Sequence, residues 1–92
     1  LHGNMPIWIT EYGYQTNPPD RSFGVSSAKQ ATYLKQAFAI ARKNARVDMM
    51  IWFLLRDEPN VGGWQSGLVT AGGKHKPSFT AFMQMALANS AP

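Results

Sequence analysis

Residues 6–13 read PIWITEYG, an apolar segment that ends in a carboxylate, an aromatic ring and a glycine. The side chains of residues 6–12 alternate usefully between two strand faces, and Pro6 suits a strand start because its missing N–H need not enter the ladder. Gly13 lets the backbone turn sharply just beyond. We therefore predict a β-strand over residues 6–12, with Glu11 at its C-terminal end.

The two-residue period of a strand predicts which of these side chains share a face. Ile7, Ile9 and Glu11 fall on one face, whereas Trp8 and Tyr12 fall on the other. A carboxylate beside two isoleucines is unusual in a sealed core. We expect this face to line the interior of a larger structure, with Glu11 emerging at its mouth, and we expect Tyr12 to face a helix layer.

A loop and a long helix are predicted next. Residues 17–20 read NPPD, which continues neither helix nor strand, so residues 14–25 are predicted to be a loop. A helix over about residues 28–45 is indicated by an apolar stripe, and Ser27 and Gln30 have the spacing of a capping box. The stripe consists of Ala31, Leu34, Ala37, Phe38 and Ala41.

The second half of the chain repeats the strand and helix order. Residues 47–55 read VDMMIWFLL, a nearly continuous apolar run that is typical of a strand covered on both faces. A glycine-rich loop over residues 56–76 is long enough to suggest a function. Pro77 is a favourable first residue for a second helix. The chain is therefore predicted to be an α/β fold with the order β-α-β-α.

Two strands and two helices do not complete a fold. A two-stranded sheet is marginally stable, and its open edges invite pairing with other chains. The simplest completion is a (β/α)8 barrel, which takes about 250 residues and of which this chain would supply two βα units. Residues 1–3 read like the end of an earlier element, in keeping with a fragment. We expect the remainder of the barrel, or other copies of the chain, as protein partners.

Composition excludes several classes of function. The chain has 92 residues and a net charge of +4, but its basic residues are spread out, so we expect no nucleic-acid partner. The absence of cysteine excludes disulfides and thiolate metal sites. The longest apolar run, residues 49–55, is far shorter than the ~20 residues that a membrane span needs. His2 and His75 lack metal-ligand spacing, and we expect no metal or other cofactor.

Several motifs together resemble one enzyme family. WITEYG at residues 8–13 resembles the seventh-strand motif of clan A glycoside hydrolases, the retaining glycosidases built on the (β/α)8 barrel. IWF at 51–53 resembles their eighth strand. LRDEP at 55–59, GLV at 67–69 and KPSF at 76–79 resemble the closing part of such barrels. The resemblance covers nearly the whole chain but only the last quarter of a catalytic domain.

The resemblance implies that residues 1–92 form the last two βα units of a barrel that cleaves O-glycosidic bonds in a carbohydrate substrate. It gives Glu11 the role of nucleophile and Trp52 the role of a stacking platform for the sugar. It also implies an extracellular location. The acid/base of the clan is a Glu that follows an Asn on the fourth strand, and the chain has no Asn-Glu pair. We therefore expect the fragment to be inactive alone.

Two further aromatic residues are candidate sugar contacts. Trp64 lies in the glycine-rich loop, where it either lines the mouth of the pocket or folds the loop down. Tyr14 flanks the turn after Glu11. A non-catalytic module that binds glycans or assembles through Trp52, Trp64 and Tyr14 is the alternative function.

Other readings of the same residues stay open. Glu11 could be a structural carboxylate that pairs with Arg21 or Arg56, or the general base of a different barrel enzyme. Trp52 could be a core residue between the sheet and the helices. Glu58 follows the second strand at a distance, so we expect it to face solvent.

Overall fold

The structure, a computed structural model, describes residues 5–90, with side chains up to residue 88. The expectation for residues 1–3 lies outside this part. The element order is β-α-β-α, as predicted, with β1 at Ile7–Tyr12, α1 at Ser27–Lys43, β2 at Val47–Trp52 and α2 at Pro77–Ser90. No helix within residues 5–90 is both long and apolar enough to cross a bilayer.

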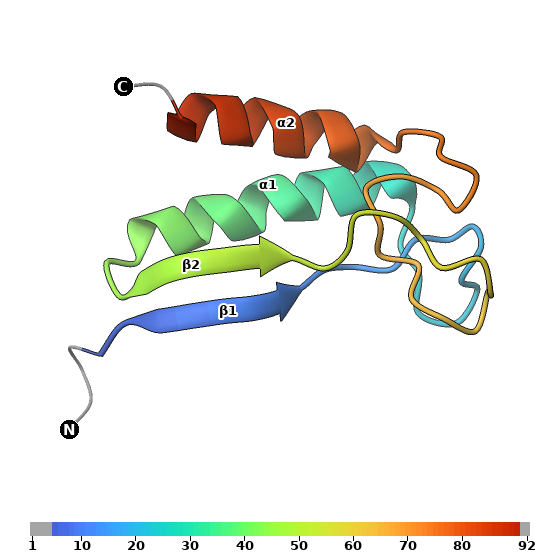
Figure 1. Cartoon of the computed structure of the whole chain (residues 1–92), viewed down its shortest axis with the longest axis horizontal. Helices are drawn as coiled ribbons and strands as arrows, with labels where there is room; N and C mark the ends of the chain where they lie inside the picture. Colours follow the sequence, from blue (N-terminus) through green and yellow to red (C-terminus); the bar gives the residue numbers. More distant parts are fainter. Residues whose placement is uncertain (1–4, 91–92) are drawn as a thin grey trace.

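The two strands form a parallel pair, and the helices pack beside it in sequence order. α1 packs on β2, and α2 packs mainly on α1. Figure 1 shows both strands pointing toward the end of the molecule where the two long loops gather, while β1 begins and α2 ends at the other end. Any site formed by the loops therefore lies at the C-terminal ends of the strands.

Helix α1 begins one residue earlier than its predicted cap implies. Ser26 is the N-cap, and its Oγ accepts a hydrogen bond of 3.1 Å from the backbone N–H of Lys29. The predicted capping box of Ser27 and Gln30 is wrong because the Gln30 side chain is fully buried and forms hydrogen bonds with loop carbonyl groups instead of capping the helix. Its Nε2 donates to the carbonyl oxygen of Tyr14 at 2.9 Å.

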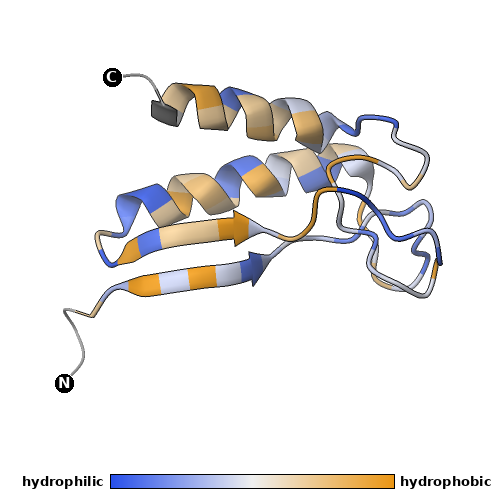
Figure 2. Ribbon diagram, in the orientation of Figure 1, coloured by the Kyte–Doolittle hydropathy of each residue, from blue (hydrophilic) through white to orange (hydrophobic). Residues whose placement is uncertain are grey.

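The core lies between α1, α2 and the β2 strand. The predicted stripe of α1 is buried except at Ala37, which is half-buried, and Figure 2 shows the alternation of polar and apolar segments along this helix. The buried apolar cluster consists of Ala31, Leu34, Phe38, Trp52, Leu68 and Ala81. Apolar residues on the opposite side of the sheet, such as Trp8 and Ile51, stay exposed.

The predicted faces of β1 are wrong up to Ile9 and correct beyond it, because the strand contains a bulge between Ile9 and Tyr12. Ile9 pairs with Met50 and Tyr12 pairs with Trp52, so three steps along β1 match two along β2. The extra residue puts Ile9 and Tyr12 on the same face, where both line a cavity against α1. Tyr12 faces the helices as expected, Ile9 joins it there, and Glu11 is exposed to solvent.

Candidate functional site

A small pocket lies where the two strands end. Its volume is about 220 Å³, and it is lined by Glu11, Tyr12, Gly13, Gln15, Phe53, Trp64 and Ser66. These residues come from the end of β1 and the loop that follows it, the residue after β2, and the long loop before α2. The pocket therefore joins a carboxylate to two aromatic rings at the loop-bearing end of the sheet.

Close backbone contacts hold the strand ends together beneath the pocket. The N–H of Phe53 donates to the carbonyl oxygen of Tyr12 at 2.8 Å, and the hydroxyl of Ser66 donates to the carbonyl oxygen of Phe53 at 2.6 Å. A Cβ at Gly13 would lie 2.5 Å from the Phe53 oxygen. Only glycine allows this approach, which explains the residue that ends the opening motif.

Phe53 and Trp64 form the aromatic wall of the pocket. Their ring centroids lie 5.9 Å apart with an interplanar angle of 89°, an edge-to-face contact. The Trp64 side chain is 54% exposed, so a ring face remains accessible. Trp64 therefore lines the pocket beside Glu11, one of the two arrangements expected for it.

The carboxylate of Glu11 has no hydrogen bond or ion pair with any residue in the described part of the chain, residues 5–90. The pairing with Arg21 or Arg56 that a structural role would need is not formed in that part. His, Asp and Glu side chains in the same part make no group of three or more that could hold a metal ion. The carboxylate faces the pocket, where it can contact a ligand directly.

Trp52 and Tyr14 lie beneath the helix layer and do not line this pocket. Trp52 is 7% exposed, belongs to the core cluster, and donates its indole N–H to the carbonyl oxygen of Ser66 at 2.9 Å. The Tyr14 ring packs against Tyr33, with centroids 4.9 Å apart. Trp52 therefore takes the core position that was its alternative reading, and it supports the pocket from below through Ser66.

The hydroxyl groups of Tyr12 and Tyr14 share a hydrogen bond of 3.0 Å. This bond, followed by burial and by the charge interaction with Tyr14, raises the pKa of Tyr12 to about 12. Tyr12 is therefore neutral at physiological pH and acts as a packing residue between the strand and α1.

A buried ion pair fixes the two loops around the pocket. The Nζ of Lys76 lies 2.9 Å from Asp57, and the two side chains are 5% and 3% exposed. The same Nζ donates to the hydroxyl of Thr16 at 2.8 Å and to the carbonyl oxygen of Gln65 at 3.2 Å. The backbone N–H of Gly67 donates to Asp57 at 2.7 Å. One ammonium group thus joins the loop after β1 to both ends of the loop after β2.

Several of these residues escaped the sequence reasoning. Phe53 directly follows the expected platform residue, and Phe53, not Trp52, lines the pocket of the carboxylate, because neighbouring side chains point to opposite faces. Ser66 and Gln15 have no local signal because their roles depend on contacts between distant loops. Glu58 does not simply face solvent: its carboxylate accepts a hydrogen bond from the backbone N–H of Trp64.

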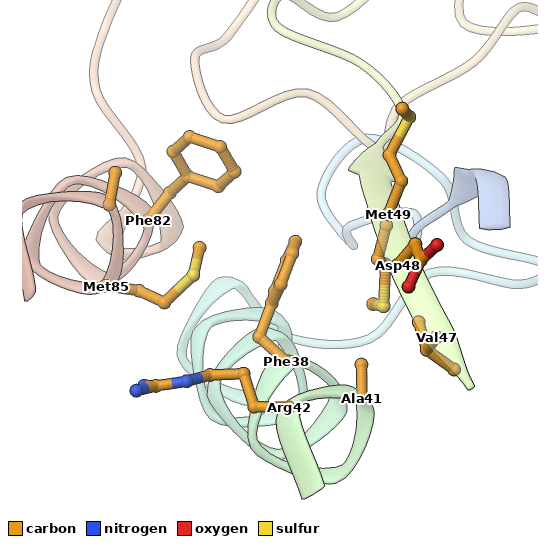
Figure 3. Close-up of a pocket in the computed structure, with 10 residues that line it drawn as sticks. Phe38, Ala41, Arg42, Val47, Asp48, Met49, Phe82 and Met85 are labelled. Carbon is orange, nitrogen blue, oxygen red and sulfur yellow. The ribbon is translucent and has the colours of Figure 1, made fainter. Parts of the chain in front are cut away.

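A second cavity of about 460 Å³ lies at the opposite end of the strands, away from Glu11. Figure 3 shows Phe82 and Met85 of α2 on one side of it, Phe38 of α1 at its base, and Met49 of β2 on the other side. It is mainly apolar and follows the edge of β2 that does not pair with β1.

The fold and the pocket together are those of part of an α/β barrel that carries a carboxylate and an aromatic wall at the C-terminal ends of its strands. The chain belongs to the glycosyl hydrolase catalytic core family, whose model matches residues 2–82. No curated protein matches the chain.

Solved structures of β-glucuronidases share this fold. The Ruminococcus gnavus enzyme in complex with uronic isofagomine superposes with a TM-score of 0.68 and 22% identity, over 87% of this chain and 15% of that one. The Dictyoglomus thermophilum enzyme superposes with a TM-score of 0.65 and 16% identity, over 95% of this chain and 16% of that one. At these identities the likeness shows the fold alone, and the chain spans only about a sixth of either enzyme.

Proposed function

We propose that this chain is the seventh and eighth βα units of a clan A glycoside hydrolase, and that Glu11 is the nucleophile of a retaining mechanism. The proposal is carried by one observation: an exposed carboxylate ends the first strand inside a pocket with an aromatic wall, in a chain of the glycosyl hydrolase catalytic core family. Active sites of (β/α)8 barrels lie at the C-terminal ends of their strands.

In a retaining mechanism the Glu11 carboxylate attacks the anomeric carbon as the glycosidic C–O bond breaks, and a second carboxylic acid gives its proton to the leaving oxygen. The resulting ester between Glu11 and the sugar is then cleaved by water, which the second carboxylate deprotonates. The two carboxyl groups must stand about 5–5.5 Å apart.

Within residues 5–90, the structure offers no second carboxyl group for this role. The chain contains five acidic residues. Asp57 is paired with Lys76, Glu58 binds the N–H of Trp64, and Asp20 binds two N–H groups of its own loop. The remaining one, Asp48, lies near the start of β2, at the opposite end of the strand from the pocket. We infer that the acid/base comes from another part of the barrel.

The remainder of the barrel also accounts for the open surfaces of the chain. The unpaired edge of β2 runs beside the apolar cavity of Figure 3, where a neighbouring strand and its side chains could be accommodated. The exposed Trp8 and Ile51 lie on the side of the sheet away from the helices, as residues of a barrel interior would. Without these partners, we expect the chain to self-associate.

Within the pocket, we assign sugar contact to Trp64 together with Phe53, because both rings line the same space as Glu11. Trp52 and Tyr14 are assigned to support of the strand ends. A non-catalytic glycan-binding module would keep the aromatic wall but would not need Glu11, so substitution of this residue separates the two functions.

The test uses the complete catalytic domain that carries this chain, assayed on aryl glycosides. We expect Glu11→Gln to lower kcat by about 10³-fold or more, because the uncharged amide neither attacks nor stabilises the positive charge of the transition state. The matched control, Asp48→Asn, removes a carboxylate at the other end of the strand and leaves kcat unchanged.

A rescue experiment defines the role of Glu11 further. In Glu11→Ala, added azide occupies the space of the carboxylate and attacks the anomeric carbon from the same side. We expect recovery of turnover and a glycosyl azide of inverted anomeric configuration. A residue that only binds the substrate would not give this product. If Glu11→Ala keeps the turnover of the wild type and forms no glycosyl azide, the nucleophile assignment is rejected.

A further inference from the structure

A larger groove adjoins the pocket of Glu11. Its volume is about 720 Å³, and its walls are residues 15 and 19–23 of the loop after β1 and residues 61–64 of the loop after β2. Gln15 and Trp64 line both the groove and the pocket. The two spaces therefore adjoin at these two residues, and adjacent units of one ligand could occupy them.

The first wall is a loop held in one shape by its own hydrogen bonds. The backbone N–H of Asn17 donates to the carbonyl oxygen of Val25 at 2.8 Å and closes the loop. The Oδ1 of Asp20 accepts from the N–H groups of Ser22 at 2.9 Å and Phe23 at 3.1 Å. Although the loop backbone is fixed, the Phe23 side chain is 82% exposed.

The second wall is fixed in a similar way. The side-chain amide of Gln65 donates to the carbonyl oxygens of Asn60 at 2.9 Å and Glu58 at 3.1 Å, and the N–H of Gly63 donates to Asn60 at 2.8 Å. The Glu58 carboxylate accepts from the N–H of Trp64. Both aromatic side chains of the groove are thus carried on loops that do not need to be ordered when a ligand binds.

The lining has the chemistry that a sugar ring requires. Phe23, Val61 and Trp64 are all more than half exposed and offer apolar surface to C–H groups. Arg21 and Gln15 add hydrogen-bonding groups on the same groove. The Glu11 pocket, at about 220 Å³, is smaller than the ~300–1,000 Å³ of typical ligand sites, whereas the groove lies within that range. Most of the ligand would therefore lie in the groove.

We propose that this groove binds the sugar unit next to the one that Glu11 attacks, so that the substrate is an oligosaccharide and not a single sugar with a small leaving group. This inference rests on the proposed function, because it assumes that a glycosidic bond is positioned at Glu11. Phe23 is then a specificity residue that contacts only the second unit, whereas Trp64 contacts both.

The experiment measures binding by calorimetry in the complete catalytic domain carrying Glu11→Gln, which prevents turnover. The ligands are the preferred monosaccharide and its disaccharide. We expect Phe23→Ala to weaken disaccharide binding about five- to tenfold, the scale of one lost aromatic contact, and monosaccharide binding less than twofold. Phe23→Trp should restore the disaccharide affinity.

Two controls make the result specific. Ile40→Ala removes a side chain that is 70% exposed on α1, away from the groove, and should change neither affinity. Trp64→Ala should weaken both ligands. Equal affinities for the two ligands, or a Phe23→Ala effect that is the same for both, would overturn the groove assignment while leaving Glu11 as nucleophile. If the domain binds the disaccharide more tightly than the monosaccharide but Glu11→Gln does not reduce hydrolysis, the proposed function is overturned instead.

Discussion

Removal of the Asp57 carboxylate should destabilise the protein more than any exposed substitution, because it leaves the buried ammonium of Lys76 without its counter-charge. The ammonium would keep two neutral acceptors, on Thr16 and Gln65. The N–H of Gly67 would also lose its acceptor. Breaking a buried pair by removing one partner costs about 3–5 kcal/mol.

The lost acceptor of Gly67 adds to this cost, since a buried unpaired amide costs about 1–3 kcal/mol. The two losses overlap, and we expect Asp57→Ala to lower the free energy of unfolding by about 4 kcal/mol or more. The measurement is urea denaturation of the complete catalytic domain, at a pH where aspartate is ionised. Lys74→Ala, an exposed lysine of the same loop, is the matched control and should stay within about 0.5 kcal/mol of the wild type.

A double variant shows whether the cost of Asp57→Ala comes from the lost attraction between Asp57 and Lys76 or from the buried, unpaired charge left on Lys76. Asp57→Leu combined with Lys76→Met removes both charges and keeps apolar volume, so it should be more stable than Asp57→Ala alone. If Asp57→Ala costs less than about 1 kcal/mol, the ion pair is not the buried junction of the two loops, and the reasoning is refuted.

Two other substitutions probe the strand end. Gly13→Ala places a methyl group 2.5 Å from the Phe53 carbonyl oxygen. We expect this clash to lower the free energy of unfolding by about 1–3 kcal/mol and kcat by about 10²-fold. The control Gly72→Ala, whose new methyl group would have its nearest neighbour at 3.9 Å, should change neither quantity. Equal effects of the two glycine variants would contradict this. Folding raises the pKa of Tyr12 from 10.0 to about 12, so the folded protein favours the neutral form of this side chain. The resulting contribution to the free energy of unfolding is complete below pH 10 and is lost as the pH rises toward 12. In Tyr14→Phe, an ultraviolet titration should show the highest tyrosine pKa moving from about 12 toward 10. If this pKa does not move, the hydrogen bond to Tyr14 is not the main cause of the raised pKa of Tyr12.

The sequence predicted the parts of the fold that depend on local patterns. The apolar stripe of α1, the apolar run of β2 and the proline that opens α2 gave the correct elements and order. Glu11 was placed correctly at the end of its strand. These features are encoded by residues that are close together along the chain, which is why periodicity reveals them.

The remaining features depend on distant contacts or on a single inserted residue. The bulge after Ile9 changes the faces of β1 without any change in composition. The hydrogen bond from Lys76 to Thr16 joins residues 60 positions apart, so no local spacing indicates it. The burial of Trp52 follows from its position on the helix side of β2, which the apolar run alone does not define.

Trapping of the covalent intermediate tests the central claim most directly. The complete catalytic domain is incubated with a 2-deoxy-2-fluoroglycosyl fluoride of the preferred sugar, and its intact mass and peptide map are recorded. We predict one added fluoroglycosyl unit, attached to the Glu11 side chain. A label on a different carboxylate, or undiminished turnover without any label, would contradict the account.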